Sequence, residues 1–85
     1  MKSVTIYTSA LCPYCWQAMK LLKNKNISFK EINVGMNAKL RQEMIQRSGG
    51  GTSVPQIFIS EQHIGGCDEI VALEQAGKLD AMLAG

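Results

Sequence analysis

SVTIYTSALCPYCWQAMKLLK occupies residues 3–23, and this stretch decides the fold. Its first part, residues 3–8, is rich in β-branched and aromatic residues and predicts a buried strand. The part after the second cysteine consists mostly of good helix formers, with apolar residues at helical spacing. Pro13 suits the first turn of a helix. We therefore expect a strand over 3–8, a helix over 13–24, and two cysteines at the junction between this strand and this helix.

Two cysteines separated by two residues, at a strand-to-helix junction, indicate a thioredoxin-like redox motif. Unpaired backbone N–H groups and the positive end of the helix dipole face the N-cap, so a Cys12 sulfur placed there is stabilised as a thiolate. The thiolate is the species that attacks disulfides, which makes Cys12 the candidate nucleophile. Cys15 lies one turn further on, where we expect a shielded thiol with a higher pKa that resolves the mixed disulfide. We expect Pro13 to stiffen the turn and to influence the reduction potential.

Length and composition predict a single small domain over residues 1–85. Eighty-five residues, 46% of them hydrophobic, can bury one compact core. The start of the chain lacks the apolar region of a signal peptide, and no apolar run approaches the length of a membrane span. Three cysteines without a secretory signal favour catalytic thiols in a reducing compartment over a disulfide scaffold. We expect a cytoplasmic monomer that does not associate with membranes.

The net charge of +2 is unevenly distributed along the chain. Residues 1–47 contain eight basic and two acidic side chains, whereas residues 48–85 contain one basic and five acidic side chains. The lysines of the first part are not interleaved with the aromatic residues and arginines typical of a nucleic-acid interface, so we expect no nucleic-acid partner. They are either solvated lysines or a positive field that attracts an anionic thiol or an acidic partner protein.

The rest of the chain predicts an α/β fold. The expected elements are strand 28–33, helix 37–47, strand 56–60, strand 63–65, helix 68–76 and helix 78–84. The first strand–helix–strand unit should be parallel and right-handed. Residues 60–62 are too few for a crossover, so the two strands that they join should form an antiparallel hairpin. Residues 49–51, all glycine, should end the second helix in a flexible loop. The result is a mixed sheet with helices on both faces.

Three motifs, in order and over nearly the whole chain, resemble those of dithiol glutaredoxins of the short bacterial type. They are Cys12-Pro13-Tyr14-Cys15, Val54-Pro55-Gln56-Ile57-Phe58-Ile59 and Gly65-Gly66-Cys67-Asp68-Glu69. They match the active-site tetrad, the segment around a cis-proline, and the glycine pair with its acidic segment. Thioredoxins usually have another tetrad, a longer chain and no such glycine pair. The resemblance implies a thioredoxin-like fold, with a four-stranded mixed sheet flanked by helices.

The resemblance also implies how glutathione binds. The main chain of Val54, held by a cis Pro55, would pair with the cysteine of glutathione as a short strand. The backbone amides of Cys67 and Asp68, at a helix N-terminus, would hold the γ-glutamyl carboxylate. Tyr14 would line the groove beside the sulfur. From the residues alone, Pro55 is better interpreted as a plain proline at a loop-to-strand junction. Asp68 is typical of a helix cap, a role that is compatible with a contact to glutathione.

The glycine pair and the third cysteine have roles that the sequence describes less fully. Gly65 and Gly66 permit a turn and a close approach of the backbone. Cys67 is either a small residue that packs at the start of a helix or a second reactive thiol of low pKa. With His63 it also suggests a Cys₃His zinc site, which we do not expect, because the side chain of His63 should face solvent.

The activity implied by the resemblance is that of a glutathione-dependent thiol–disulfide oxidoreductase. Glutathione would be the cosubstrate, and no metal is expected. The partners would be glutathionylated or disulfide-containing proteins, with ribonucleotide reductase as one candidate. Two alternatives remain open: an electron donor fed by thioredoxin reductase, and a dimer that shares a [2Fe–2S] cluster. Pro13 disfavours the cluster, because relatives that carry one usually have a small flexible residue there.

Two positions depart from the family pattern. Many relatives have lysine where this chain has Ser9, three residues before the nucleophile. The loop over residues 49–53, which often contains Arg or Gln in relatives, has no charged side chain here. A positive charge near this loop would have to come from the side chain of Arg47 or Lys39. We therefore expect glutathione affinity at the weaker end for the family.

Overall fold

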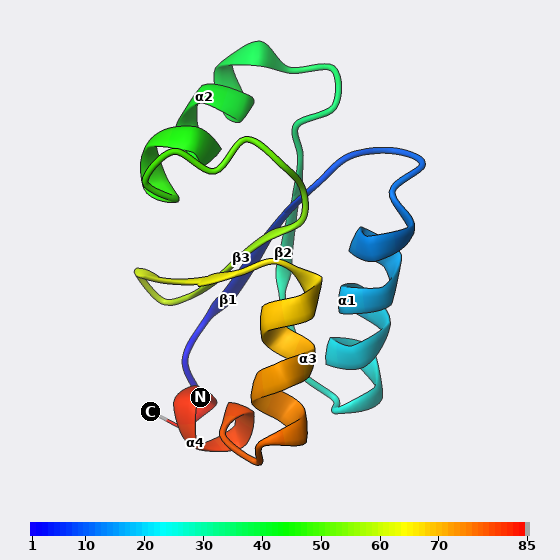
Figure 1. Ribbon diagram of the computed structural model, residues 1–85, viewed down its shortest axis with the longest axis vertical. Helices are drawn as coiled ribbons and strands as arrows, with labels where there is room; N and C mark the ends of the chain where they lie inside the picture. The colour runs from blue at the N-terminus through cyan, green and yellow to red at the C-terminus, as the bar shows by residue number, and fades with distance from the viewer. Residues whose placement is uncertain (85) are drawn as a thin grey trace.

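A four-stranded mixed sheet forms the centre of the computed structural model, which describes residues 1–84. The strands are β1 (Val4–Thr8), β2 (Lys30–Asn33), β3 (Gln56–Ile59) and β4 (Gln62–Gly65), in the order β2-β1-β3-β4. β1 pairs with β2 in parallel and with β3 in antiparallel orientation, and β3 and β4 form an antiparallel hairpin (Figure 1). The predicted mixed sheet, parallel unit and hairpin are confirmed.

The helices of the described chain are α1 (Pro13–Asn24), α2 (Ala38–Arg47), α3 (Cys67–Gln75) and α4 (Leu79–Leu83). α1 has the predicted bounds, with Pro13 as its first residue. α2 begins one residue later than predicted, because Asn37 is its N-cap and accepts a hydrogen bond from the N–H of Leu40. α3 begins one residue earlier than predicted, at Cys67. The N–H of Cys67 therefore belongs to the first turn of this helix.

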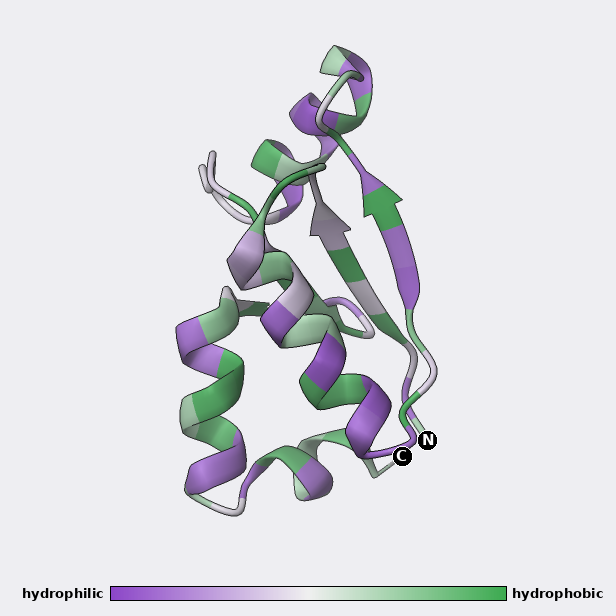
Figure 2. Cartoon of the chain, turned by 90° about the vertical axis from the view of Figure 1, so that its right-hand side faces the viewer, coloured by the Kyte–Doolittle hydropathy of each residue, from purple (hydrophilic) through white to green (hydrophobic). Residues whose placement is uncertain are grey.

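β1, one of the two inner strands, sends its side chains to both faces of the sheet, as the period of two in a strand requires. Val4 and Ile6 pack in one core cluster with residues of α1 and α3. Tyr7 packs in a second cluster on the other face, with Met44 of α2. In Figure 2, α1 and α3 lie side by side on the same side of the strands. This face is the one that positions the cysteines.

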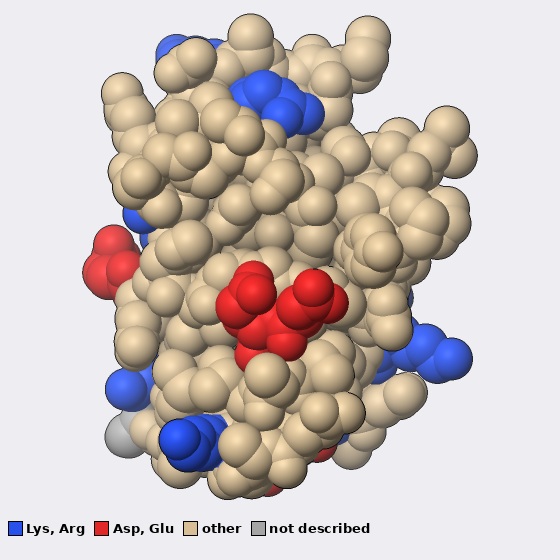
Figure 3. Space-filling model, in the orientation of Figure 1, with Lys and Arg blue, Asp and Glu red and all other residues tan. Residues whose placement is uncertain are grey.

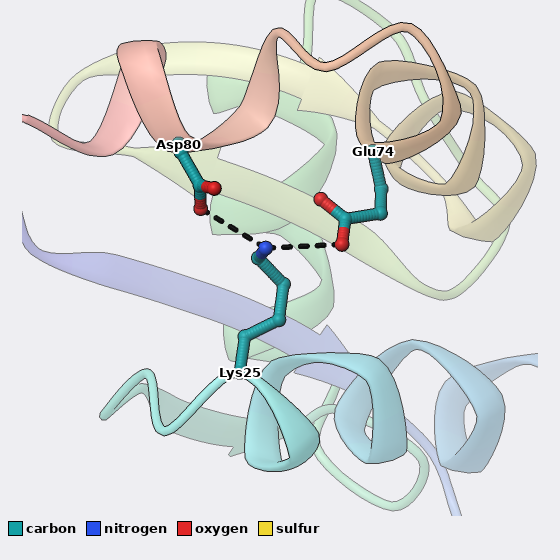
Figure 4. A network of polar contacts seen from close by, with 3 residues as sticks. All are labelled: Lys25, Glu74 and Asp80. Carbon is teal, nitrogen blue, oxygen red and sulfur yellow. Dashed lines mark hydrogen bonds and ion pairs between the residues drawn. The ribbon is translucent and has the colours of Figure 1, made fainter.

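A network of ion pairs ties the far ends of the helices on this face together (Figure 4). Lys25, the C-cap of α1, places its Nζ 3.0 Å from the Oε2 of Glu74 and 3.0 Å from the Oδ1 of Asp80. The hydrogen bond to Asp80 makes the largest contribution to raising the pKa of Lys25, and the hydrogen bond to Glu74 raises this pKa further. These contacts link α1, α3 and α4 at the end of the molecule away from the cysteine pair. Within residues 1–84, no helix is long and apolar enough to cross a membrane.

Candidate functional site

Cys12 is the N-cap of α1, as predicted from the sequence. Its backbone is extended, and its Sγ accepts a hydrogen bond from the N–H of Cys15 at 3.2 Å. Leu11, just before it, has a φ of 56°, in the left-handed region that turns the chain from β1 toward the helix. The sulfur therefore lies where the unpaired N–H groups and the dipole of α1 favour a negative charge.

A second segment, far away in the sequence, meets this sulfur. The Sγ of Cys12 donates a hydrogen bond to the carbonyl oxygen of Val54 at 3.9 Å. The Val54–Pro55 peptide bond is cis, which confirms the isomer expected from the family resemblance. The structure thus brings the first two sequence motifs into direct contact.

Cys15 lies beneath Cys12, with no solvent exposure. Burial raises its pKa to about 12, and the hydrogen bond with Cys12 acts in the same direction. The prediction that Cys15 is a shielded thiol with a raised pKa is therefore confirmed. This thiol keeps its proton at neutral pH, while Cys12 is partly exposed to solvent.

A groove of about 190 Å³ opens beside the cysteine pair. It is lined by Tyr14, Ser53, Val54, Pro55, Gly66, Cys67, Asp68 and Glu69. Every residue for which the family resemblance implies a contact with glutathione lies along this groove. The sequence indicated these residues in three separate motifs, and the fold places them around one hollow.

The glycine pair lets the start of α3 approach the cis-proline closely. A Cβ on Gly66 would lie 3.2 Å from the carbonyl oxygen of Pro55, closer than side-chain carbons normally come. Gly65 has a φ of 122°, a conformation that residues with a side chain rarely adopt. A side chain would therefore be strained at Gly65 and crowded at Gly66, which lines the groove.

The start of α3 is capped by Glu69 and not by Asp68. The N-cap of this helix is Gly66, whose N–H donates to the Oε1 of Glu69 at 2.6 Å. The alternative interpretation, in which Asp68 serves as the helix cap, is therefore wrong. Figure 3 shows acidic side chains gathered over the start of α3, where Asp68 and Glu69 lie in the sequence.

Cys67 is a packing residue. It is 5% exposed and belongs to the core cluster that includes Ala18 of α1 and Ile70 of α3. Burial raises the pKa of its thiol, and the negative charge of Asp68 adds to this effect. The interpretation of Cys67 as a second thiol of low pKa is wrong, because desolvation outweighs the favourable end of the helix.

His63 lies on β4, and its ring is held by neighbours on the sheet. It is hydrogen-bonded through Nε2 to the Oε1 of Gln56 at 2.6 Å and lies 5.0 Å from the ring of Phe58. No group of three or more His, Cys, Asp or Glu side chains within residues 1–84 could hold a metal ion. The Cys₃His arrangement considered from the sequence does not occur among these residues.

Arg47 does not reach the loop before the cis-proline. Its Nη1 donates to the hydroxyl of Tyr7 at 2.8 Å, and its guanidinium lies 4.3 Å from the centre of the Phe58 ring. The loop is instead contacted by Arg41, whose Nη1 donates to the carbonyl oxygen of Thr52 at 3.2 Å. Arg41 was not identified from the sequence, because the residues of α2 do not show which loop will lie against this helix.

Comparisons with known proteins agree on one family. The family model named Glutaredoxin matches residues 4–64. Glutaredoxin 3 of Escherichia coli strain K12 is 54% identical over 83 residues, which cover 98% of this chain and 99% of that protein. A glutaredoxin of Pseudomonas aeruginosa is 52% identical over 84 residues, covering 99% of both chains.

Solved structures show the same architecture. The solution structure of a glutaredoxin from Brucella melitensis has a TM-score of 0.84 and 49% identity, covering 98% of this chain and 89% of that one. The crystal structure of a buckwheat glutaredoxin–glutathione complex has a TM-score of 0.85 and 27% identity, covering 96% and 76%. The predicted thioredoxin-like α/β fold is therefore confirmed.

Proposed function

Since the chain belongs to the glutaredoxin family, we propose that this thiol–disulfide oxidoreductase takes its electrons from glutathione. Its substrates would be protein disulfides and mixed disulfides between proteins and glutathione. The observation that carries the proposal is the position of the Cys12 sulfur, 3.9 Å from the carbonyl oxygen of Val54, which lines a groove of about 190 Å³.

The chemistry of the groove fits glutathione group by group. The main chain of Val54 offers a hydrogen-bonding pair to the cysteine of the tripeptide, in the manner of an added strand. The first N–H groups of α3, those of Cys67 and Asp68, suit its γ-glutamyl carboxylate. The exposed carboxylate of Asp68 suits the neighbouring amino group, and Tyr14 also lines the groove.

Glutathionylated proteins require Cys12 alone. Its thiolate attacks the glutathione sulfur of the mixed disulfide, and the protein sulfur leaves as a thiolate. The enzyme is left with glutathione bound to Cys12. The thiolate of a second glutathione then attacks the bound glutathione, which releases oxidised glutathione and restores the Cys12 thiolate.

Protein disulfides require both cysteines. Cys12 attacks one sulfur and forms a mixed disulfide with the substrate, while the other substrate sulfur leaves as a thiolate. Cys15 then loses its proton and attacks Cys12, which releases the reduced substrate and leaves a Cys12–Cys15 disulfide. Two glutathiones reduce this disulfide and are themselves oxidised.

We further propose that the chain works as a single-domain monomer in the cytoplasm, with ribonucleotide reductase as one candidate partner. The similarity to bacterial glutaredoxins of almost the same length supports this setting.

The test is consumption of NADPH coupled through glutathione reductase, with glutathionylated cysteine as the substrate. We expect turnover that disappears in the Cys12→Ser variant. An enzyme without turnover under these conditions, but reduced by NADPH and thioredoxin reductase, would refute glutathione as the electron source and support the alternative donor.

A further inference from the structure

α1 presents two different flanks to solvent beside the same nucleophile. Its buried stripe consists of Cys15, Ala18 and Leu22. Tyr14 lies on the flank that lines the groove. Trp16 follows two residues later, and a rotation of about 100° per residue places it on the opposite flank. A substrate that joins two halves through one disulfide can therefore place one half on each flank.

The second flank carries a shallow hollow of about 370 Å³. It is lined by Trp16, Met19, Lys20, Lys23 and Asn24, which we call the Trp16 strip. Trp16 is 53% exposed, although tryptophan is among the side chains that gain most from burial. Exposed tryptophans are enriched where proteins bind one another, since they fill pockets on the partner.

The charge of the strip is positive and uncompensated. Lys20 and Lys23 are exposed and form no ion pair within residues 1–84, in contrast to Lys25, which is held by two carboxylates. α1 itself contains no acidic residue. On the other flank, the groove wall carries Asp68 and Glu69. A partner that covers the strip would thus be acidic.

We propose that the Trp16 strip binds the protein half of the substrate, as an extended segment with an apolar side chain and acidic residues near its cysteine. With a rise of about 1.5 Å per residue, Trp16, Lys20 and Lys23 lie about 6, 12 and 16 Å along the axis from Cys12. An extended segment covers about 3.3 Å per residue. Its apolar residue would lie about two positions from the cysteine, and its acidic residues four and five.

This proposal deepens the proposed function, and its test is made independent of glutathione. The Cys15→Ser variant is reacted with peptides whose single cysteine carries thionitrobenzoate. Cys12 attacks the peptide sulfur, thionitrobenzoate leaves, and the peptide stays bound through a disulfide. One peptide has leucine two positions from the cysteine and glutamates four and five positions from it, on both the N-terminal and the C-terminal side. The other peptide has lysines in place of the glutamates.

Trp16 is the single tryptophan of the chain, so its fluorescence reports on the strip directly. We expect the acidic peptide to shift the emission to shorter wavelength and to protect Trp16 from acrylamide quenching, and the basic peptide to do neither. Replacing both lysines, as Lys20→Gln with Lys23→Gln, should abolish the protection. Lys2→Gln with Lys30→Gln, which removes two exposed lysines outside the strip, is the matched control and should retain it.

A kinetic comparison adds a functional readout. With glutathionylated forms of the two peptides, wild-type enzyme should prefer the acidic one by about five- to tenfold in kcat/KM, as expected for a contact at an interface hot spot. The preference should lie in KM and should be lost in the double lysine variant. Equal fluorescence and equal kcat/KM for both peptides would overturn the proposal. Turnover of neither peptide, with Trp16 still protected, would count against glutathione dependence and leave the docking surface standing.

Discussion

The sulfur of Cys12 and the carbonyl oxygen of Val54 lie 3.9 Å apart, although 42 residues separate them in the chain. The contact joins the start of α1 to the loop before β3. It places the sulfur of Cys12 beside the main chain of Val54, next to the cis Val54–Pro55 bond. Under the proposed function, the reactivity of Cys12 and the recognition of the attacked disulfide would both depend on this junction.

The two cysteines should separate the two activities. Cys12→Ser should abolish both activities, since Cys67, the other thiol at the groove, is buried and its pKa is raised by that burial. Cys15→Ser should retain removal of glutathione from proteins and lose reduction of protein disulfides, because resolution alone requires Cys15. Both are measured by coupled NADPH consumption, with glutathionylated cysteine and with a disulfide-containing protein. Loss of both activities in Cys15→Ser would contradict the assignment.

Stability should fall in alkaline solution because of Cys15. Its pKa is about 12 in the folded protein, against 9.0 for an ordinary cysteine. The unfolded chain therefore releases this proton first, and the contribution of Cys15 to stability is complete below pH 9 and is lost as the pH rises toward 12. Urea denaturation of the reduced protein between pH 8 and about 11 measures this fall. Cys15→Ala should show a shallower pH dependence, and an unchanged slope would refute the account.

Gly65 should tolerate a side chain less well than another glycine of similar backbone. In Gly65→Ala, the new Cβ would lie 2.7 Å from the Cγ of Glu69, at a φ of 122°. Gly50, with a φ of 111° and no atom within 4 Å of such a Cβ, is the matched control. Gly50→Ala should cost about 1 to 3 kcal/mol of unfolding free energy from the backbone alone. Gly65→Ala should cost clearly more and raise the KM for glutathionylated cysteine, as compared by urea denaturation and the coupled assay.

A lysine in place of Ser9 should strengthen glutathione binding. The position lies three residues before the nucleophile, and the loop over residues 49–53 has no charged side chain of its own, although Arg41 donates to the carbonyl oxygen of Thr52. Ser9→Lys should lower the KM for glutathione, and the effect should weaken as salt is added. Ser28→Lys, at an exposed position just before β2, controls for net charge. An identical KM in Ser9→Lys and wild type would show that the missing charge is unimportant.

The Lys25 network should stabilise the helical face of the protein without affecting the chemistry. Lys25→Gln removes both ion pairs, to Glu74 and Asp80, so the midpoint of urea denaturation should fall modestly. The difference from wild type should shrink at high salt, because partly exposed pairs are screened. Lys39→Gln should leave the midpoint unchanged. A large loss of turnover in Lys25→Gln would show that the network also positions the cysteines.

Much of the fold was predictable because its signals are local. Pro13 and the helix formers after it define the start of α1, and the β-branched and aromatic residues of β1 define a buried strand. The short connection between β3 and β4 allows only a hairpin. These rules act over a few residues and need no knowledge of what the elements pack against. α3 begins one residue earlier than predicted, because Gly66 is its N-cap and donates its N–H to the Oε1 of Glu69.

By itself, the sequence determined the order of the elements, the N-cap position of Cys12 and the three motifs that line the groove. The tertiary structure alone decided how far each cysteine thiol is buried. Cys67 begins a helix, as Cys12 precedes one, and from the sequence both were candidates for reactive thiols. Packing against α1 buries Cys67 and raises its pKa, whereas Cys12 remains partly exposed at the edge of the groove. Desolvation depends on atoms brought together from distant parts of the chain, and no local pattern encodes it.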